Sequence, residues 1–484
     1  MKTVRENASV PEIKIVGAEV VESERKIPIV GKYNVIIAGG GATGVMAAVA
    51  SARNGASTLL IEQGGFLGGS LTAAYQLNFG QPSFASKDTQ LIRGIPGEMV
   101  ERLVKKGGFL RSNGSSPFDP EMFKYVALKM LLEAMVNFRF YTTITDSIGE
   151  NNTIKGIITE SKAGRQAFLA ERIVDCTGDA DVAARAGVPF NIGRDSDHHV
   201  QPLSMGFIVG GVDLDSVIKY VEDNPEDFGM GVNRTILEKG VRPVVRVIGF
   251  FNITRKYAKD YGMQVLYTRF KNLPIGSGKE IVAVNMARVY KYNPLDPDEL
   301  TKAEIMLREQ VFGILNFLKD HIPGFRNAYL LSTAPSLGIR ESRQIIGEYV
   351  LQPEDVIKGR MFEDAILHSA VAYVSGGPGH PVDGWEGSPG STYEVPQKHW
   401  VEYEIPYGVS VPKVIDNLLV AGKCKSATHV AMGLTKSVPV CMAEGQSAGT
   451  AAALSIKEGV IPRNLNVKML QQQLRKDGAY LPER

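Results

Sequence analysis

The sequence predicts an α/β protein built on a Rossmann-like βαβ unit, with an α+β unit inserted into it. Three observations predict this fold. A short apolar run ends in a glycine-rich turn at 39–44, a helix of small residues follows, and a second apolar run ends at Glu62. Strand-and-glycine patterns return at 172–179 and 416–454. The stretch between them has strand-like and helical runs but no second glycine motif.

The first strand, residues 35–38, is short, apolar and β-branched, as a buried parallel strand should be. It runs into Gly39-x-Gly41-x-x-Gly44. The first glycine permits a tight turn, the second lets the backbone approach a diphosphate, and the third lets the helix pack closely. The N-terminus of the helix stabilises phosphate charge. We expect phosphate contacts from Gly39, Gly41, Ala42, Thr43 and Gly44.

An acidic residue ends the second strand. Glu62 follows the apolar run 57–61, about 20 residues past the glycines, where a dinucleotide site places a carboxylate for ribose hydroxyls. A lone glycine triplet would be weak evidence. Here strand, turn, helix, second strand and acid occur in order, so the sequence predicts a dinucleotide site. The alternative is a glycine-rich turn that binds no ligand.

Four further segments indicate which dinucleotide the chain binds. A Gly68-Gly69 pair follows Glu62, and a strand at 172–175 ends in Thr177-Gly178-Asp179. A strand at 416–421 ends in Gly422, a small-residue helix follows at 438–454, and residues 338–343 read GIRESR. Over residues 33 to 455 the chain resembles a family of FAD-dependent oxidoreductases with these motifs. It is more distantly similar to the fumarate reductase and succinate dehydrogenase flavoproteins.

The resemblance implies FAD and an FAD-binding domain of the glutathione reductase type. It also implies that backbone near Ile144 faces the adenine, and that the closing strand and helix pass the flavin. No histidine lies at 75–80, so noncovalent binding is expected. Beyond the five residues of the first turn, the implied cofactor contacts are Glu62, Gln63, Gly68, Gly69, Ser70, Ile144, Thr177, Gly178, Asp179, Gly422, Gly445 and Ala448.

We predict four segments along the chain. Residues 1–32 form an N-terminal extension that could add an edge strand or a subunit contact. Residues 33–195 and 331–484 form the two parts of the FAD-binding domain. Residues 196–330 form the inserted substrate domain.

Local patterns predict several other elements. Asp119 caps a helix that runs from Pro120 to about 135. Further helices are expected at 98–106 and 301–318. Strands are expected at 138–144, 154–159, 166–171, 205–209 and 244–248, and a long glycine- and proline-rich loop at 375–390.

Composition excludes several functional classes. The 484 residues are 44% hydrophobic and carry a net charge of +2, so nothing favours nucleic acid as a partner. Three scattered cysteines predict neither a disulfide framework nor an iron–sulfur or other metal site. No apolar run of about 18 residues is present, so membrane insertion is not expected. Residues 1–24 lack a secretory core, which favours the cytoplasm, and a homo-oligomer is left open.

Four side chains are candidates for catalysis. His429 lies between the closing strand and helix, where similar flavoproteins place a histidine beside the substrate; the alternative is a core imidazole. Lys436 stands where related sequences often have arginine, and it cannot clamp a carboxylate bidentately. Arg340 in GIRESR could contact substrate or flavin, or join a structural ion-pair lattice. His380 lies in the long loop and could reach the site as a lid residue.

The sequence therefore predicts an FAD-dependent oxidoreductase that transfers a hydride between flavin and a small organic substrate. Its electron donor or acceptor is not indicated. The alternative is a non-redox flavoprotein, such as a hydratase, isomerase or lyase, that uses FAD structurally or electrostatically. A scaffold with a vestigial flavin site is disfavoured because motifs are intact near both ends of the chain.

Overall fold

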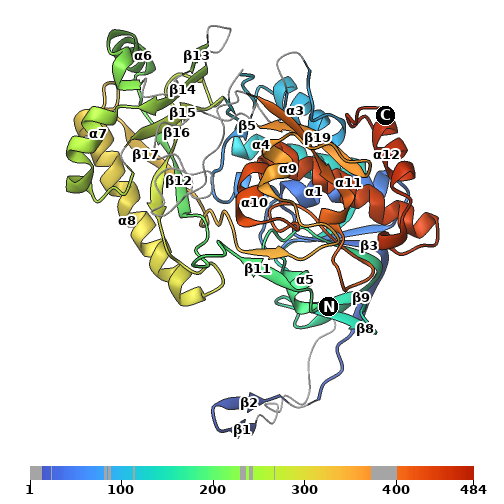
Figure 1. The fold of residues 1–484 in the computed structure, drawn as a ribbon. Coiled ribbons are helices and arrows are strands. Elements are labelled where there is room, and N and C mark those ends of the chain that lie inside the picture. The colour runs from blue at the N-terminus through green and yellow to red at the C-terminus, as the bar shows by residue number, and fades with distance from the viewer. Residues whose placement is uncertain are drawn as a thin grey trace.

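Two β-sheets organise the molecule (Figure 1). The computed structural model describes residues 14–22, 24–80, 84–85, 89–112, 115–228, 236–238, 244–265, 267–371 and 400–483. The first sheet contains strands from both ends of this range, whereas the strands of the second all come from its middle. This arrangement confirms the α/β class with an inserted α+β part.

The first sheet has seven strands in the order β7-β4-β3-β10-β9-β8, with β21 also paired to β10. Strands β7, β4, β3, β10 and β21 run parallel, so their carboxyl ends meet at one edge. The strands are β3 (Ile29–Ala38), β4 (Thr58–Ile61), β7 (Asn137–Arg139), β8 (Thr143–Glu150), β9 (Thr153–Glu160), β10 (Gln166–Asp175) and β21 (Leu418–Val420).

Helices cover both faces of this sheet. On one face, α1 packs directly on α11, and α3, α4 and α12 surround this pair. The short α5 packs on β8 and β10, and apolar clusters fill both sides. The elements are α1 (Ala42–Arg53), η1 (Gly69–Leu71), α3 (Gly94–Lys105), α4 (Pro120–Glu133), α5 (Asp181–Arg185), α9 (Pro353–Ile357), α10 (His429–Thr435), α11 (Val438–Lys457) and α12 (Val467–Lys476).

The second sheet is antiparallel, with six strands in the order β13-β14-β15-β16-β12-β17. One face carries an apolar cluster shared with the long helix α8. The elements are β12 (Leu203–Gly210), α6 (Leu214–Asp223), β13 (Ile236–Glu238), β14 (Val244–Gly249), α7 (Phe251–Tyr257), β15 (Thr268–Asn272), β16 (Val282–Val289), α8 (Pro297–His321) and β17 (Tyr329–Thr333).

Short two-stranded sheets complete the described structure. Strand β12 contacts the first part of the chain, because Gln76 donates to the Ser204 hydroxyl at 3.3 Å. The hairpin β1–β2 projects away from the body (Figure 1). The remaining strands are β1 (Lys14–Val16), β2 (Glu19–Val21), β5 (Phe79–Gly80), β6 (Ser115–Ser116), β11 (Phe190–Ile192), β18 (Arg343–Ile345), β19 (Ala365–Val371) and β20 (Val401–Pro406).

Some predicted elements need correction. The single strand at 138–144 is wrong: β7 ends at Arg139 and β8 begins at Thr143, because Tyr141 adopts a positive φ of 53° and its N–H bonds to Gly64. Residues 166–175 form one strand rather than two. Helix α3 begins at Gly94, four residues before the predicted start at 98. The Asp119 cap is confirmed, since its carboxylate accepts from the Glu121 N–H at 2.8 Å.

The division into four segments stays a prediction. Strand β3 begins at Ile29, inside the predicted extension, and β17 crosses the predicted boundary at 330. The loop predicted at 375–390 lies outside the described residues.

Candidate cofactor and substrate site

The turn after β3 is tight on its protein side and open on the other. Gly39 has a φ of +97°, and a Cβ on it would lie 2.7 Å from the Cys176 carbonyl oxygen. A Cβ on Gly44 would lie 1.9 Å from the Gly39 carbonyl oxygen. Beside Gly41, by contrast, the nearest atom to a Cβ would be the Gly69 Cα at 3.9 Å. Such a turn lets a ligand approach the backbone at the middle glycine.

Glu62 holds the backbone around this turn. Its carboxylate accepts from the Gly40 N–H at 2.7 Å and from the Gly64 N–H at 2.6 Å. The Gly68 N–H donates to the Gly40 carbonyl at 2.9 Å, so the 68–72 loop lies against the same turn. Glu62 thus fixes two backbone segments, and its predicted bond to a ribose stays a prediction.

The end of β10 is fixed by two carboxylates. Asp175 is fully buried and accepts from the N–H groups of Thr177, Val182 and Ala183. Asp179 accepts from the Lys423 ammonium at 2.5 Å and from the Ser342 hydroxyl. Asp179 therefore ties the GIRESR segment to the turn after β21.

A buried ion pair sets the turn after β21. The Lys425 ammonium lies 2.5 Å from the Glu444 carboxylate, and both side chains are fully buried. Glu444 also accepts from the Gly422 N–H at 3.0 Å, and Lys425 donates to the Thr435 carbonyl at 3.0 Å. The pair joins the turn, α10 and α11 into one unit.

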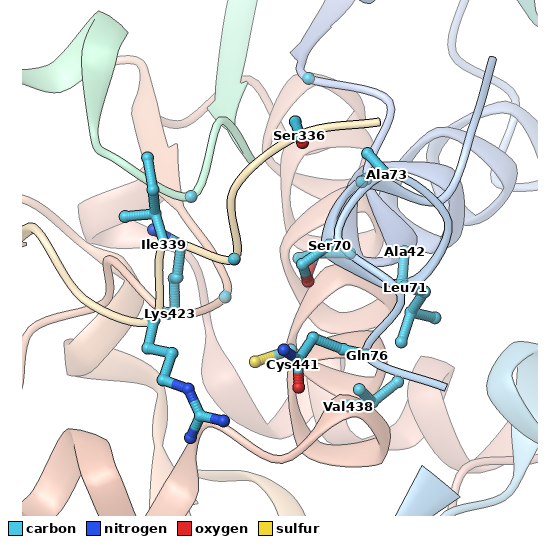
Figure 2. A pocket seen from close by; sticks show the side chains of 18 of the residues that line it. Ala42, Ser70, Leu71, Ala73, Gln76, Ser336, Ile339, Lys423, Val438 and Cys441 are labelled. Atoms are coloured by element: carbon cyan, nitrogen blue, oxygen red, sulfur yellow. The ribbon is translucent and has the colours of Figure 1, made fainter. Parts of the chain in front are cut away.

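These turns surround a cavity of about 810 Å³, within the usual range for small-molecule sites. Residues of β14, β15 and β16 line its other side. Figure 2 shows Ser336, Ile339, Lys423 and Cys441 around the space that Ala42 and Ser70 border. Of the predicted site residues, the lining includes Gly39, Gly41, Ala42, Thr43, Glu62, Gln63, Gly69, Ser70, Ile144, Thr177, Gly178, Asp179, Gly422, Arg340 and Lys436.

Five other predicted residues do not line this cavity. Gly44 and Gly68 shape the turns behind it. Gly445 lies in the contact between α11 and α1, where a Cβ would come 2.1 Å from the Thr43 carbonyl oxygen. Ala448 is buried one turn further along α11. The structure therefore gives Gly445 and Ala448 a packing role. His429 is the fifth.

A comparison of the sequence with known protein families identifies the class of protein. The model of the family described as FAD dependent oxidoreductase matches residues 34–474. The chain belongs to this family. FAD is thus the cofactor, and the protein is a flavin redox enzyme with a small-molecule substrate and a redox partner.

The geometry of this oxidoreductase fits FAD. The N-terminus of α1 has no side-chain cap at Gly41, so its first N–H groups are available to a diphosphate beside the open turn. Helix α11 also begins at the cavity without a side-chain cap, at Ser437, whose buried hydroxyl lacks a partner within the described residues. Bound FAD supplies the hydride chemistry, and the chain supplies orientation and charge.

Solved structures give only weak likenesses. A geranylgeranyl bacteriochlorophyll reductase-like protein from Thermoplasma acidophilum is 12% identical, with a TM-score of 0.45 over 92% of this chain and 84% of that one. A p-nitrophenol 4-monooxygenase from Pseudomonas putida is 12% identical, with a TM-score of 0.42 over 91% and 83%. These likenesses indicate neither substrate nor reaction. A search of curated proteins finds no match.

His429 lies behind the cavity wall, at the start of α10. Its Nδ1 lies 2.6 Å from the Glu341 carboxylate, which is fully buried. The other Glu341 oxygen accepts from the Gln201 backbone N–H at 2.8 Å, and the side-chain carboxamide oxygen of Gln201 accepts from the Lys436 ammonium. The imidazole is thus linked to the cavity through Glu341, Gln201 and Lys436.

Two cationic side chains of this region face the cavity. Burial and the nearby Arg340 guanidinium lower the pKa of Lys436 well below its ordinary value of 10.5. Burial and Arg288 lower the pKa of Arg340, although an arginine stays charged at neutral pH. Arg343, in contrast, bonds to the Asp179 carbonyl at 2.8 Å and to the Asp181 carboxylate at 3.1 Å, which is a structural role.

The remaining candidates add no chemistry. His380 lies outside the described residues. Cys424 is fully buried, and burial raises its pKa, as expected of an inert thiol. In the described ranges, no three His, Cys, Asp or Glu side chains are grouped as metal ligands. No described helix is long and apolar enough to cross a bilayer.

The sequence did not predict the contacts between residues that are distant from each other along the chain. Glu341 and Gln201 lie 140 residues apart, and Lys425 and Glu444 meet only because α11 follows the strand turn. It also missed the polar side chains of the second sheet, Arg246, Arg269, Lys271 and Asn285. The sequence signal was the presence of polar residues inside strand-like runs.

Proposed function

We propose that this oxidoreductase transfers a hydride between FAD and a small organic substrate held between the first-sheet turns and the second sheet. The observation that carries the proposal is the cavity itself, which is continuous from Gly41 to Lys271. A dinucleotide along the first-sheet turns leaves the second-sheet side for substrate. Hydride transfer requires such close approach of the two reactants with water excluded.

Lys436 and Arg340 are the proposed catalytic residues. Both line the cavity near the start of α11, whose N-terminus favours negative charge. A partly buried lysine with a lowered pKa can accept or donate a proton nearer neutral pH than an ordinary lysine. Arg340 supplies a fixed positive charge that orients an anionic or carbonyl oxygen.

His429 is proposed as a positioning residue rather than as the direct proton donor. It fixes the Glu341 carboxylate, which holds Gln201 against Lys436. Replacing His429 should therefore alter the pH dependence of turnover through Lys436. The fourth candidate, His380, stays a prediction.

The test is anaerobic mixing of the FAD-loaded enzyme with a panel of small organic acids while the oxidised-flavin absorption band is followed. We expect one of them to bleach the band. Lys436→Met should slow bleaching about 10²–10⁴-fold with unchanged FAD content, and the charge-retaining Lys436→Arg should slow it less. Substrate conversion without any bleaching would support the non-redox alternative instead.

Assembly and location remain predictions. Ile15, Val16, Val20 and Val21 of the β1–β2 hairpin are exposed apolar side chains, which supports a subunit contact through this hairpin. The sequence favours a cytoplasmic protein that does not bind nucleic acid.

A further inference from the structure

The second sheet presents a group of positive charges to the cavity. Arg246 on β14 and Arg269 and Lys271 on β15 all line it, and we call these three residues the cation cluster. Side chains alternate between the two faces of a strand. Val245, Val247 and Phe270, which alternate with them, belong to the apolar cluster shared with α8. The cation cluster therefore lies on the face opposite that core.

Register brings these cations close together. Arg246 is the direct cross-strand partner of Lys271 in the antiparallel pair β14–β15. Such partners have Cβ atoms about 4.5–5.5 Å apart, and like charges there are destabilising. Arg269 is two residues before Lys271, so it shares that face and is diagonal to Arg246. Burial and the two guanidiniums lower the pKa of Lys271 well below its ordinary value.

Lys271 differs in its partners from two basic residues on the first-sheet side of the cavity. On the first-sheet side, Lys423 pairs with Asp179 and Arg185 with Asp181. Within the described residues, the Lys271 ammonium has no carboxylate partner; Arg246 and Arg269 also interact elsewhere in the chain. The lining as a whole has seven basic and three acidic residues: Arg185, Arg246, Arg269, Lys271, Arg340, Lys423 and Lys436 against Glu62, Asp179 and Asp181.

A neighbouring polar atom independently points to a ligand. Asn285 on β16 lines the cavity, and its carboxamide oxygen is buried without a hydrogen-bond partner in the described part of the chain. Ala283, two residues earlier, is the cross-strand partner of Lys271, so Asn285 shares the face of the cation cluster. A buried carbonyl oxygen that lacks a donor costs about 1–3 kcal/mol. A bound molecule with a hydroxyl or N–H group would satisfy it.

We infer that the cation cluster and Asn285 form the subsite that holds the non-reacting end of the substrate. This end carries an oxyanion, either a carboxylate or a phosphate, that faces the cation cluster, and a hydroxyl or N–H group that donates to Asn285. The inference rests on the proposed function and names its substrate class. Strands β15 and β14 are two and three positions from β12, which corresponds to roughly 10 and 14 Å at a strand spacing of about 4.8 Å. The cation cluster is thus two and three strands away from the strand that contacts Gln76. Binding energy from such a remote group can orient the reacting end.

The test is calorimetric titration of the FAD-loaded enzyme with succinate, inorganic phosphate and the neutral polyol erythritol. We expect at least one anion to bind and erythritol not to bind. The anion that binds more tightly identifies the oxyanion of the substrate as a carboxylate or as a phosphate. Lys271→Gln should weaken anion binding about 10-fold or more, the scale of one charge-assisted hydrogen bond. Asn285→Asp, which adds a negative charge at nearly constant size, should do the same.

Lys279→Gln is the matched control, since Lys279 is exposed in the β15–β16 connection. If either anion binds but Lys279→Gln weakens it as much as Lys271→Gln, the binding is non-specific and the inference fails. Failure of both anions to bind would also overturn it. So would loss of FAD from the Lys271→Gln enzyme, because the cation cluster would then serve the diphosphate. Lys271→Arg should retain binding, which separates lost charge from lost folding. Flavin reduction measured on the same samples tests the proposed function separately.

Discussion

The two sides of the cavity are built from different parts of the chain. The first-sheet side is mainly backbone: the glycine turn, the start of α1 and the turns after β4, β10 and β21. Some of its charges form ion pairs, as between Lys423 and Asp179. The second-sheet side consists of side chains on three adjacent strands, and it is positively charged. A backbone surface suits a cofactor that never changes, whereas a surface of side chains can be altered residue by residue to select a substrate.

The largest expected effect comes from the ion pair behind the first-sheet side. Lys425→Met leaves the Glu444 carboxylate buried without its cation, and burial already raises the pKa of Glu444. We expect the free energy of unfolding to fall by about 3–5 kcal/mol, with FAD lost as the Gly422 turn moves. Chemical denaturation measures this, with Lys457→Met at the exposed end of α11 as control. A loss no greater than that of an exposed pair, about 1 kcal/mol or less, would show that the turn does not need Lys425.

Glu62 tests whether the same side holds both backbone and cofactor. Glu62→Ala removes the acceptor for the Gly40 and Gly64 N–H groups. FAD binding should weaken by about 1.5–3 kcal/mol, as for hydrogen bonds to a charged group. Fluorescence titration of the apoprotein with FAD measures this, and Glu160→Ala at the exposed end of β9 is the control. Unchanged FAD affinity would exclude Glu62 from the cofactor site.

Two glycines separate packing from ligand contact on this side. Gly44→Ala places a Cβ against the Gly39 carbonyl, so it should destabilise the apoprotein by about 1–3 kcal/mol. Gly41→Ala puts its methyl group into the open space and should weaken FAD binding while leaving apoprotein stability nearly unchanged. Thermal unfolding with and without FAD distinguishes the two. Equal effects on apoprotein stability would mean that Gly41 is not open to the ligand.

The smallest effect is expected on the second-sheet side, and it has the opposite sign. Without anions, Lys271→Gln should stabilise the enzyme by about 0.2–1 kcal/mol, because it removes a like charge opposite Arg246. The folded state lowers the pKa of Lys271, so the unfolded chain binds its proton more tightly. At pH values below the pKa of Lys271 in the folded enzyme, this lysine therefore destabilises the fold to its full extent. The destabilisation disappears as the pH rises toward 10.5, the ordinary pKa of a lysine. Denaturation at several pH values measures this. A Lys271→Gln enzyme that is less stable at neutral pH would contradict it.

The turns of the first-sheet side could be predicted from the sequence because their parts are local. Gly39, Gly41 and Glu62 lie within one βαβ unit, and the spacing of glycines reports backbone that must bend or admit a ligand. It placed Gly445 at the cofactor for the same reason, although that glycine serves the contact between α11 and α1. A glycine alone does not reveal whether a ligand or a helix comes close.

The second-sheet side could not be predicted in the same way. Arg246 and Lys271 meet only through the register of an antiparallel pair, and Asn285 joins them from a third strand. Each is a polar residue within a strand-like run, which is also the pattern of a solvent-facing strand. Likewise, nothing in the local sequence of His429 indicated that Glu341 would hold its ring behind the cavity wall.

A crystal structure of the FAD-loaded enzyme soaked with succinate and phosphate tests the central claim most directly. We expect the FAD diphosphate beside Gly41 and Ser70, and an anion bound by Lys271 with Asn285 beside it. FAD phosphates bound to the cation cluster, or anions bound only elsewhere, would contradict the assignment of one side of the cavity to cofactor and the other to substrate.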